Sequence, residues 1–437
     1  MNGADMDDAG SGDEAQSTLT DGVDDPLFEP DDGEDDPLFS GEDGVLNQTE
    51  LIRNPGLLEI STVPESDRIV GRTEQIRDVA MNIGPIVNGQ EPSPVMIYGK
   101  TGTGKSLVSK HTSKRIVDQA AREGRNVSTA YIDCAQDNTK TQVVSKIARK
   151  LNIEAGEPLD IPVTGLGPSH YYQYIWTLLD EQFDGAIVIL DEIDQLQPIE
   201  EMNNVLMQLS RAREASKTSA HIGIIGISNK IDFGESLNER VKSSLGDTEP
   251  VFPPYDANQL RSILEAREDA FYEDALSSSV IPRTAALAAR EHGDARKAVR
   301  ILKNAGKIAQ NNGDSKVIVE HVNDAQMRAE VDRLRELLAT DTPHARYVLL
   351  ALAELTLNNS QDTFRTTHVF DVYEGVCEKE GADSLKLDRV RDLLRNHAFN
   401  DITESTLESG GRGKGTYKVH RLLKDPEVVR ESVMREM

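Results

Sequence analysis

The sequence predicts an α/β fold in which helices cover a parallel sheet built around a phosphate-binding loop. First, GKTGTGKS at 99–106 follows an apolar run at 95–98 and precedes a helical pattern. This is the P-loop motif GxxxxGK[ST] in the strand–loop–helix setting that it requires. Second, the apolar run 186–190 ends in Asp191 and Glu192, which is typical of a parallel strand buried on both faces. Third, strands and helices alternate up to about residue 255, a pattern that favours a parallel sheet.

These two motifs supply complementary parts of an ATPase site. The loop glycines let successive backbone N–H groups surround a polyphosphate, and the positive end of the following helix adds to the attraction. Lys105 would reach the β- and γ-phosphates, while the Ser106 hydroxyl would ligate Mg²⁺. Asp191 would hold the same ion through water, and Glu192 would polarise the attacking water as a general base. ATP or ADP with Mg²⁺ is therefore the expected cofactor, and the expected contacts of the loop run through Thr101, Gly102, Thr103, Gly104, Lys105, Ser106 and Leu107.

Apolar periodicity divides the chain into successive parts. In 51–254 we expect strands at 95–98, 128–133, 186–190 and 221–227, with helices at 73–86, 107–123, 141–151, 171–183 and 200–214. Helices alone are expected at 257–271, 282–291, 295–310 and 317–338, which indicates an all-α lid over 255–340. The remainder, 341–437, has helical patterns at 344–357, 367–379 and 386–397, then strand-like runs at 402–407 and 417–419 around the glycine-rich stretch 410–415.

The composition points to a cytoplasmic protein with an unusually acidic surface. The net charge is −27, of which residues 1–45 contribute sixteen acidic side chains and no Lys or Arg. The rest of the chain still carries −11, which suits a high-salt cytoplasm and suggests a halophilic source. The two cysteines are far apart and indicate neither a disulfide framework nor a metal cluster. No stretch approaches the roughly 18 apolar residues of a membrane span, so no membrane partner is expected.

The N-terminal segment 1–50 is expected to be disordered, because it has too few apolar residues to offset the entropy of ordering. Within it the sequence DDPLF occurs at 24–28 and again at 35–39. The repeat is either a duplicated solvating linker or a pair of docking motifs that offer Leu-Phe to a partner's apolar groove.

Further blocks, in their order and spacing, resemble the archaeal origin-recognition and cell-division-control initiators, a family of AAA+ ATPases. The resemblance covers about residues 58–423 and rests on DRIVGR at 67–72, IIGISN at 224–229, RVKSSL at 240–245, FPPYDA at 252–257 and GDARKA at 293–298. It implies that Val70 and Gly71 form the entry to the adenine pocket and that Asn229 is the sensor asparagine. It also implies that Arg296 is the sensor arginine of the lid. Independently, Arg296 opens a lid helix, so lid closure would bring its charge to the phosphates.

The same resemblance places three more residues at the nucleotide. Tyr255 and Arg267 would cover it from the lid side, and Arg240 would act on the nucleotide of a neighbouring subunit. Glu239 stands where the family usually has proline, which leaves open whether Arg240 acts in trans or is structural.

The C-terminal part, 341–437, resembles the winged-helix domain of this family. Residues 381–424 carry nine basic and six acidic side chains, a local reversal of charge that favours a DNA-binding surface. The helix at 386–397 would enter a major groove, and the glycine-rich loop would follow the minor groove or the phosphates. The cations expected at DNA are Lys386, Arg389 and Arg395 on the helix and Arg412 and Lys414 in the loop. In addition, GPSHYY at 167–172 falls where the family carries its initiator-specific DNA-contacting element.

The resulting hypothesis is an ATP-dependent replication initiator with slow, switch-like ATPase turnover. It would bind double-stranded origin DNA, recruit the replicative helicase or other replication proteins, and self-associate on DNA. A DNA-bound regulator or paralogue, for which ATP is only a structural or switching ligand, is the alternative. A motor or loader without sequence-specific DNA binding is a third possibility, which the C-terminal domain disfavours.

Overall fold

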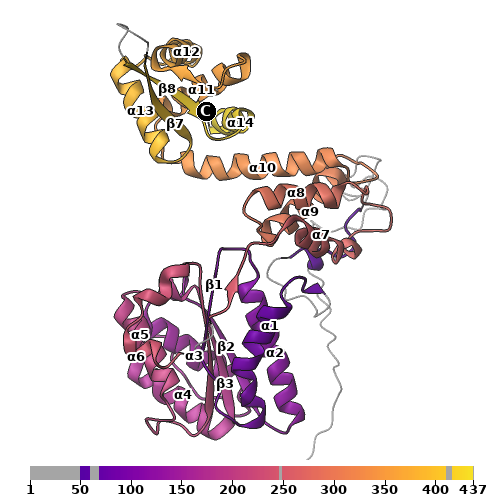
Figure 1. Ribbon diagram of the computed structural model, residues 1–437, viewed down its shortest axis with the longest axis vertical. Coiled ribbons are helices and arrows are strands. Elements are labelled where there is room, and N and C mark those ends of the chain that lie inside the picture. The colour runs from indigo at the N-terminus through magenta and orange to yellow at the C-terminus, as the bar shows by residue number, and fades with distance from the viewer. Residues whose placement is uncertain (1–49, 60–67, 246–248, 410–415, 437) are drawn as a thin grey trace, which may run out of the picture. The chain divides into compact units, whose positions relative to one another are not determined.

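A computed structural model describes residues 50–59, 68–245, 249–409 and 416–436 (Figure 1). The acidic segment with its two DDPLF repeats lies outside the described residues, as do Arg412 and Lys414. The predictions made for them therefore stay predictions.

A five-stranded parallel sheet forms the centre of the first part, in the order β2-β3-β4-β1-β5. Its strands are β1 (Val95–Gly99), β2 (Val127–Asp133), β3 (Gly185–Asp191), β4 (His221–Ser228) and β5 (Val251–Phe252). In the register of β2 and β3, Asp133 is the partner of Asp191. The phosphate loop follows β1, and Asp191 and Asn229 stand at or just after the ends of β3 and β4. These motifs therefore gather at one edge of the sheet, where α/β folds bind ligands.

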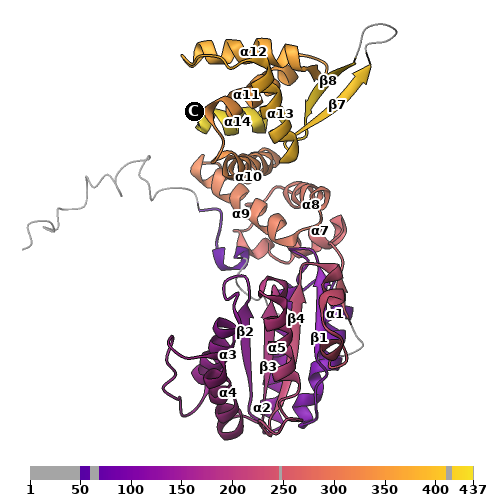
Figure 2. The same cartoon turned by 90° about the vertical axis from the view of Figure 1, so that its left-hand side faces the viewer.

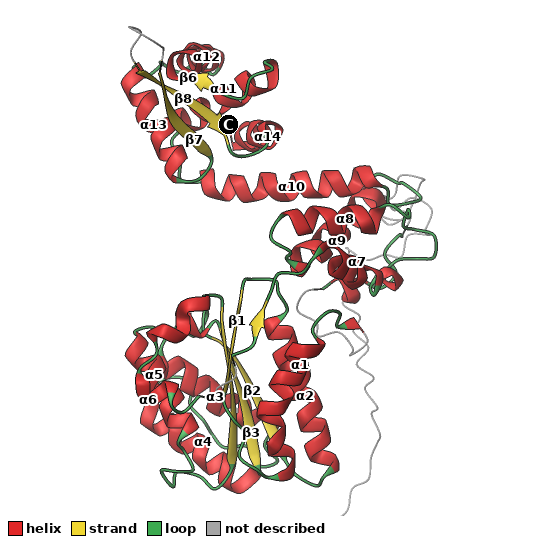
Figure 3. Cartoon of the chain, in the orientation of Figure 1, coloured by secondary structure: helices red, strands yellow, loops and turns green. Residues whose placement is uncertain are grey.

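Helices cover both faces of this sheet (Figures 1 and 3). Apolar side chains of α1 (Thr73–Ile83) and α2 (Lys105–Arg122) pack on one face with Ile97, Ile189 and Ile227. The opposite face is covered by α3 (Lys140–Glu154), α4 (Pro168–Gln182) and α5 (Ile199–Ser210). The short α6 (Glu239–Lys242) follows. The apolar runs of β1, β3 and β4 are buried, because these strands have helices above and below them.

The lid consists of α7 (Ala257–Glu265), α8 (Val280–Arg290), α9 (Ala295–Asn311) and the first half of α10 (Val319–Leu338). Leu51 and Leu58, which precede the sheet in the sequence, are buried in the same core. The backbone N–H groups of Arg53 and Asn54 donate to the carbonyl of Ala270, which holds this segment on the lid.

The C-terminal part is a winged helix, with helices α11 (Pro343–Asn358), α12 (Thr366–Lys379), α13 (Leu387–Phe399) and α14 (Pro426–Glu436). Its antiparallel sheet has the order β6-β8-β7, formed by β6 (Phe364–Arg365), β7 (Thr403–Ser409) and β8 (Thr416–Leu422). Figure 2 shows β7 and β8 as a two-stranded ribbon. The second half of α10 contributes Val331, Leu334 and Leu338 to this core, so one helix belongs to both neighbouring cores.

Three predicted helices are longer than the structure has them. The helix expected over 73–86 ends at Ile83, where the 3₁₀ turn Gly84–Asn88 begins. The helix expected over 200–214 ends at Ser210, where turns lead to Ser216 in the left-handed region with a φ of 53°. The helix expected over 257–271 ends at Glu265, because the chain turns to pair Phe271 with Ile52. The two-residue strands β5 and β6 were not predicted, because they are too short for an alternating pattern. The helices missed are α6, α14 and the 3₁₀ turns Pro55–Leu58, Ile193–Gln195 and Ile231–Ser236. The 3₁₀ turns Gly84–Asn88 and Glu268–Ala270 fall at the ends of predicted helices.

Candidate functional site

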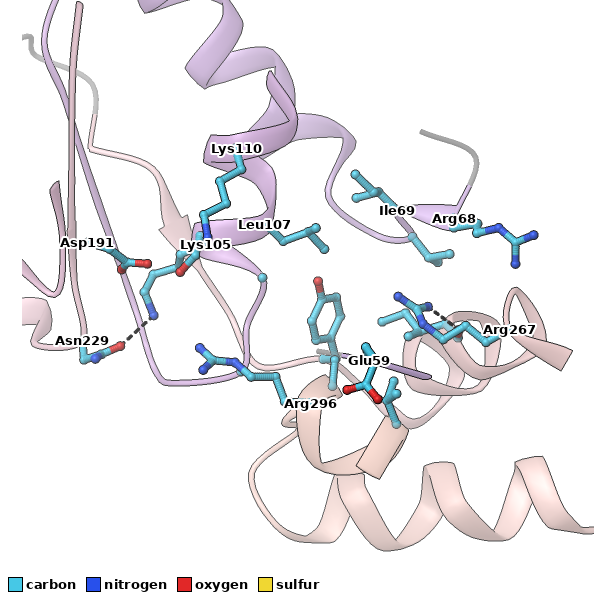
Figure 4. A pocket seen from close by; sticks show the side chains of 18 of the residues that line it. Glu59, Arg68, Ile69, Lys105, Leu107, Lys110, Asp191, Asn229, Arg267 and Arg296 are labelled. Atoms are coloured by element: carbon cyan, nitrogen blue, oxygen red, sulfur yellow. Dashed lines mark hydrogen bonds between the residues drawn. The ribbon is translucent and has the colours of Figure 1, made fainter. Parts of the chain in front are cut away.

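A cavity of about 270 Å³ lies beside the phosphate loop, between the edge of the sheet and the lid (Figure 4). Lys105, Asp191 and Asn229 lie at one end and Ile69 and Arg267 at the other (Figure 4), and the apolar side chains of Val70 and Ile263 also line the cavity. This division suits a ligand with a charged and an aromatic end. The structure brings twelve of the predicted site residues to this one cavity: Val70, Gly102, Gly104, Lys105, Ser106, Leu107, Asp191, Glu192, Asn229, Tyr255, Arg267 and Arg296.

Two glycines give the phosphate loop its shape. Gly102 and Gly104 adopt φ angles of 77° and 86°, in the left-handed region that only glycine enters freely. Space is also restricted at both positions. A Cβ atom on Gly102 would lie 1.9 Å from Oδ1 of Asp294, and one on Gly104 would lie 2.5 Å from the hydroxyl of Tyr255. The loop is therefore a backbone cradle that a side chain would fill.

Lys105 is buried at the floor of this cradle. Its ammonium donates hydrogen bonds to the carbonyls of Gly99 (2.7 Å) and Lys100 (2.8 Å) and to Oδ1 of Asn229 (2.9 Å; Figure 4). Burial lowers the pKa of Lys105 to about 8, against the opposing attraction of Asp191. The folded chain thus holds a costly buried cation at the position where phosphate charge would stabilise it.

The acidic pair after β3 is held by its neighbours. Asp191 is only 6% exposed, and its Oδ1 accepts a hydrogen bond from the backbone N–H of Glu192 at 3.0 Å. Glu192 has a φ of 51°, an uncommon conformation for a residue with a side chain. Its Oε1 accepts from Nδ2 of Asn229 at 3.2 Å. The side-chain amide of Asn229 thus connects the buried Lys105 with Glu192, the candidate general base.

The first turn of α9 joins the lid to the phosphate loop. The backbone N–H of Ala295 donates to the carbonyl of Gly102 at 3.2 Å. Asp294 caps the helix by accepting from the backbone N–H groups of Arg296 (2.8 Å) and Lys297 (3.2 Å). Arg296 extends from this turn into the cavity (Figure 4).

A second link between the lid and the loop is the buried Arg72. Its guanidinium donates to the carbonyls of Thr103 (2.9 Å) and Pro253 (2.6 Å). It also lies 3.8 Å from the ring centroid of Tyr255, in the geometry of a cation–π contact. Tyr255 is thereby fixed where it borders the cavity.

Arginines border the apolar end of the cavity. The guanidinium of Arg68 pairs with Asp269 of the lid at 2.6 Å. Arg267 donates to the carbonyl of Ile263 at 2.7 Å, and burial lowers its pKa.

Four predicted residues do not line the cavity. Gly71 packs against the side chain of Gln259. Thr101 is exposed, whereas Thr103 is buried with its hydroxyl donating to the carbonyl of Lys100. Arg240 is exposed on α6.

Other lining residues were not predicted, because their sequence neighbourhoods carry no motif. Arg68 and Ile69 fall within the block at 67–72 and Ala295 within the block at 293–298, so these two blocks were the signals available. The unpredicted lining residues are Glu59, Arg68, Ile69, Lys110, Tyr131, Asp133, Ile263, Ala295 and Val299.

The cavity fits a nucleoside triphosphate with Mg²⁺. The backbone cradle at Gly102 and Gly104 and the buried charge of Lys105 suit the phosphates. The hydroxyl of Ser106 and the carboxylate of Asp191 line the same space and are hard oxygen ligands, the type that Mg²⁺ prefers.

The candidate DNA-binding cations lie on α13. Lys386 is at its N-cap, and Arg389 and Arg395 are exposed farther along the helix. Both arginines lie near Asp392, with nearest distances between charged atoms of 3.9 and 3.2 Å. Val390 and Leu394 are buried on the other face. Within the described residues, none of the helices has the length and apolar character to cross a bilayer.

Three family models match successive parts of the chain. An AAA domain matches residues 88–230, a Cdc6 AAA+ ATPase-type lid domain matches 261–327, and the C-terminal winged-helix domain of CDC6 matches 336–432.

Among curated proteins, the chain is 50% identical over 382 residues to ORC1-type DNA replication protein 9 of Haloarcula marismortui, covering 87% of this chain and 91% of that protein. It is 48% identical over 414 residues to ORC1-type DNA replication protein 4 of Halobacterium salinarum, covering 95% and 96%. Both relatives come from halophiles.

Among solved structures, the Aeropyrum pernix ORC1 protein in complex with DNA aligns with a TM-score of 0.62 at 32% identity, over 89% of this chain and 98% of that one. Cdc6p from Pyrobaculum aerophilum has a TM-score of 0.55 at 21% identity, over 88% of this chain and 99% of that one. At 21% identity, the similarity to Cdc6p shows a shared fold.

Proposed function

We propose that this chain, which belongs to the family of ORC1-type DNA replication proteins, is a replication initiator that binds double-stranded origin DNA under the control of bound nucleotide. Its fold is an AAA+ core with a Cdc6-type lid and a C-terminal winged helix. The observation that carries the proposal is that the phosphate loop, the acidic pair and a lid arginine meet in one cavity of a chain half identical to such proteins.

We infer ATPase chemistry from the cavity. Lys105 would bind the β- and γ-phosphates, and Ser106 and Asp191 would hold the Mg²⁺ that neutralises their charge. Glu192 would accept a proton from water at its carboxylate, oriented by Asn229. Arg296 would add positive charge from the lid.

Turnover is expected to be slow and switch-like, because the lid itself forms part of the site. The backbone bond from Ala295 to Gly102 and the cap by Asp294 tie lid position to the loop. A change at the phosphates would therefore alter the lid, and through α10, which is shared by the lid and winged-helix cores, the C-terminal domain.

Binding to DNA is proposed from the winged helix and from a related protein. The Aeropyrum pernix ORC1 structure is a complex with DNA, and α13 presents exposed cations at the position of a recognition helix. The element at 167–172, which begins α4, is a second proposed contact. Recruitment of a helicase, self-association and an in-trans role for Arg240 complete the proposal. A cytoplasmic location follows from this role, since archaeal chromosomes lie in the cytoplasm.

Crosslinking the protein to genomic DNA in cells and mapping the bound sites tests the role. Peaks confined to repeats at origins support initiation, whereas sites at promoters would favour the DNA-bound regulator.

Salt titrations of two variants on origin and scrambled duplexes test the DNA-binding surface. Arg389→Ala should cost about 1–3 kcal/mol on the specific site and relax sequence preference at one or two positions. In contrast, Arg412→Ala with Lys414→Ala should weaken binding to both duplexes equally. It should also reduce the slope of log affinity against log salt concentration by about 0.9 per lost phosphate contact. If neither variant changed binding, the winged helix would not be the DNA-reading module.

A further inference from the structure

Tyr131 contacts the proposed metal-holding carboxylate from a strand that carries no ATPase motif. It lies on β2, two residues before Asp133, and Asp133 is the register partner of Asp191 on β3. Side chains two residues apart on a strand share a face. The sheet order therefore places the Tyr131 ring diagonally next to Asp191.

The contact leaves both carboxylate oxygens of Asp191 with a donor from the protein. The hydroxyl of Tyr131 donates to Oδ2 at 2.7 Å, while the backbone N–H of Glu192 donates to Oδ1 at 3.0 Å. Two hydrogen bonds to different oxygens fix the rotation of the carboxylate plane.

The ring of Tyr131 is itself held from the other side. Nζ of Lys110, on α2, lies 3.5 Å from the ring centroid, a cation–π geometry. Lys110 and Tyr131 both line the cavity. Lys110, Tyr131 and Asp191 thus form a chain of contacts from the helix after the phosphate loop to the acidic pair.

We propose that Tyr131 is a positioning residue that orients the Asp191 carboxylate for the Mg²⁺ of bound nucleotide. The inference rests on the nucleotide site proposed above. A carboxylate fixed in advance loses less freedom when it engages a metal, and removing such an outer hydrogen-bond partner typically costs about 10- to 100-fold in metal affinity or activity. Lys110 supports the ring and does not touch the carboxylate in this scheme.

Tyr131→Phe removes only the hydroxyl and is tested by calorimetry of ATP binding in EDTA and in Mg²⁺. The ratio of the two dissociation constants measures how much the metal contributes to binding. We expect the Kd in EDTA to match wild type, and the gain from Mg²⁺ to fall about tenfold. Half-maximal hydrolysis should require correspondingly more Mg²⁺.

Thr218→Val is the matched control, because its hydroxyl also donates to a carboxylate in the same domain, Oδ1 of Asp180 at 2.7 Å, but it does not line the cavity. It should leave the Mg²⁺ gain unchanged. Adding Tyr131→Phe to Asp191→Asn should also change nothing further, since the hydroxyl acts through that carboxylate.

An unchanged Mg²⁺ gain in Tyr131→Phe would overturn the inference while leaving the nucleotide site intact. An equal loss of affinity in EDTA and in Mg²⁺ would also overturn it, because it would indicate a packing role. Should Tyr131→Phe fold poorly, Lys110→Met provides the second test. The gain from Mg²⁺ should fall because the Tyr131 ring loses its contact with Lys110, and an unchanged gain would overturn the inference. If wild type bound no ATP in either condition, the proposed nucleotide site would fail together with the inference.

Discussion

Replacing Gly102 with alanine is expected to detach the lid from the phosphate loop. The new Cβ would lie 1.9 Å from Oδ1 and 2.0 Å from Cγ of Asp294. Both distances are well inside van der Waals contact, so either the loop or the first turn of α9 must move. The carboxylate of Asp294 caps α9, and its displacement would release that cap and move Arg296 away from the cavity.

The cost has two parts that the structure separates. Gly102 has a φ of 77°, and an alanine in the left-handed region costs about 1–2 kcal/mol. Loss of an aspartate N-cap costs about 1 kcal/mol. Gly102→Ala should therefore lower the free energy of unfolding by about 2–3 kcal/mol.

Gly124→Ala is the matched control for backbone strain. Gly124 has a φ of 76°, and a Cβ there would meet nothing within 4 Å. Gly124→Ala should therefore lower the free energy of unfolding only by the cost of backbone strain, about 1–2 kcal/mol. Urea unfolding in molar KCl measures both variants, and hydrolysis should fall only in Gly102→Ala.

Asp294→Ala completes a double-mutant cycle. In the wild-type background, Asp294→Ala removes the N-cap and should lower the free energy of unfolding by about 1 kcal/mol. In the Gly102→Ala background it should lower that free energy by almost nothing, because the cap is already lost. Equal destabilisation by Gly102→Ala and Gly124→Ala, with normal hydrolysis, would refute the contact between lid and loop.

Three other predictions concern separate parts of the chain. Glu192→Gln should retain ATP binding and stop hydrolysis, because the amide keeps the shape of the side chain without its basicity. Calorimetry measures the binding and phosphate release measures the hydrolysis. Turnover near the wild-type rate would exclude Glu192 as the general base. Deleting residues 1–45 should leave thermal stability and binding to origin DNA unchanged, since this acidic segment repels phosphates; a defect seen only in cells would support docking by the DDPLF repeats. His420 is buried, with its ring nitrogens bonded to Thr366 and Ser405, and burial lowers its pKa to about 4. Because the unfolded chain binds this proton below about pH 6.5, stability should fall between pH 6.5 and 4, and His420→Gln should flatten that part of a urea-unfolding series.

Local sequence determined the chemistry of the phosphate site. The spacing of Gly99, Gly104 and Lys105 specifies a loop whose backbone surrounds phosphate, and the apolar run before Asp191 specifies a strand buried on both faces. Both are short-range patterns, because a loop conformation depends on glycine positions and strand burial depends on consecutive apolar side chains. The helices were predicted for the same reason, with the largest errors at the ends of α5 and α7.

Tertiary structure decided which side chains surround those motifs. Tyr131 contacts Asp191 only because β2 lies next to β3 in the sheet. The apolar periodicity of a strand does not predict which strand will be its neighbour. Likewise Leu51 enters the lid core by packing with helices more than 200 residues later. Contacts of this kind depend on how apolar faces from distant segments are buried together, so a local pattern contains the chemistry of a residue but not its neighbours.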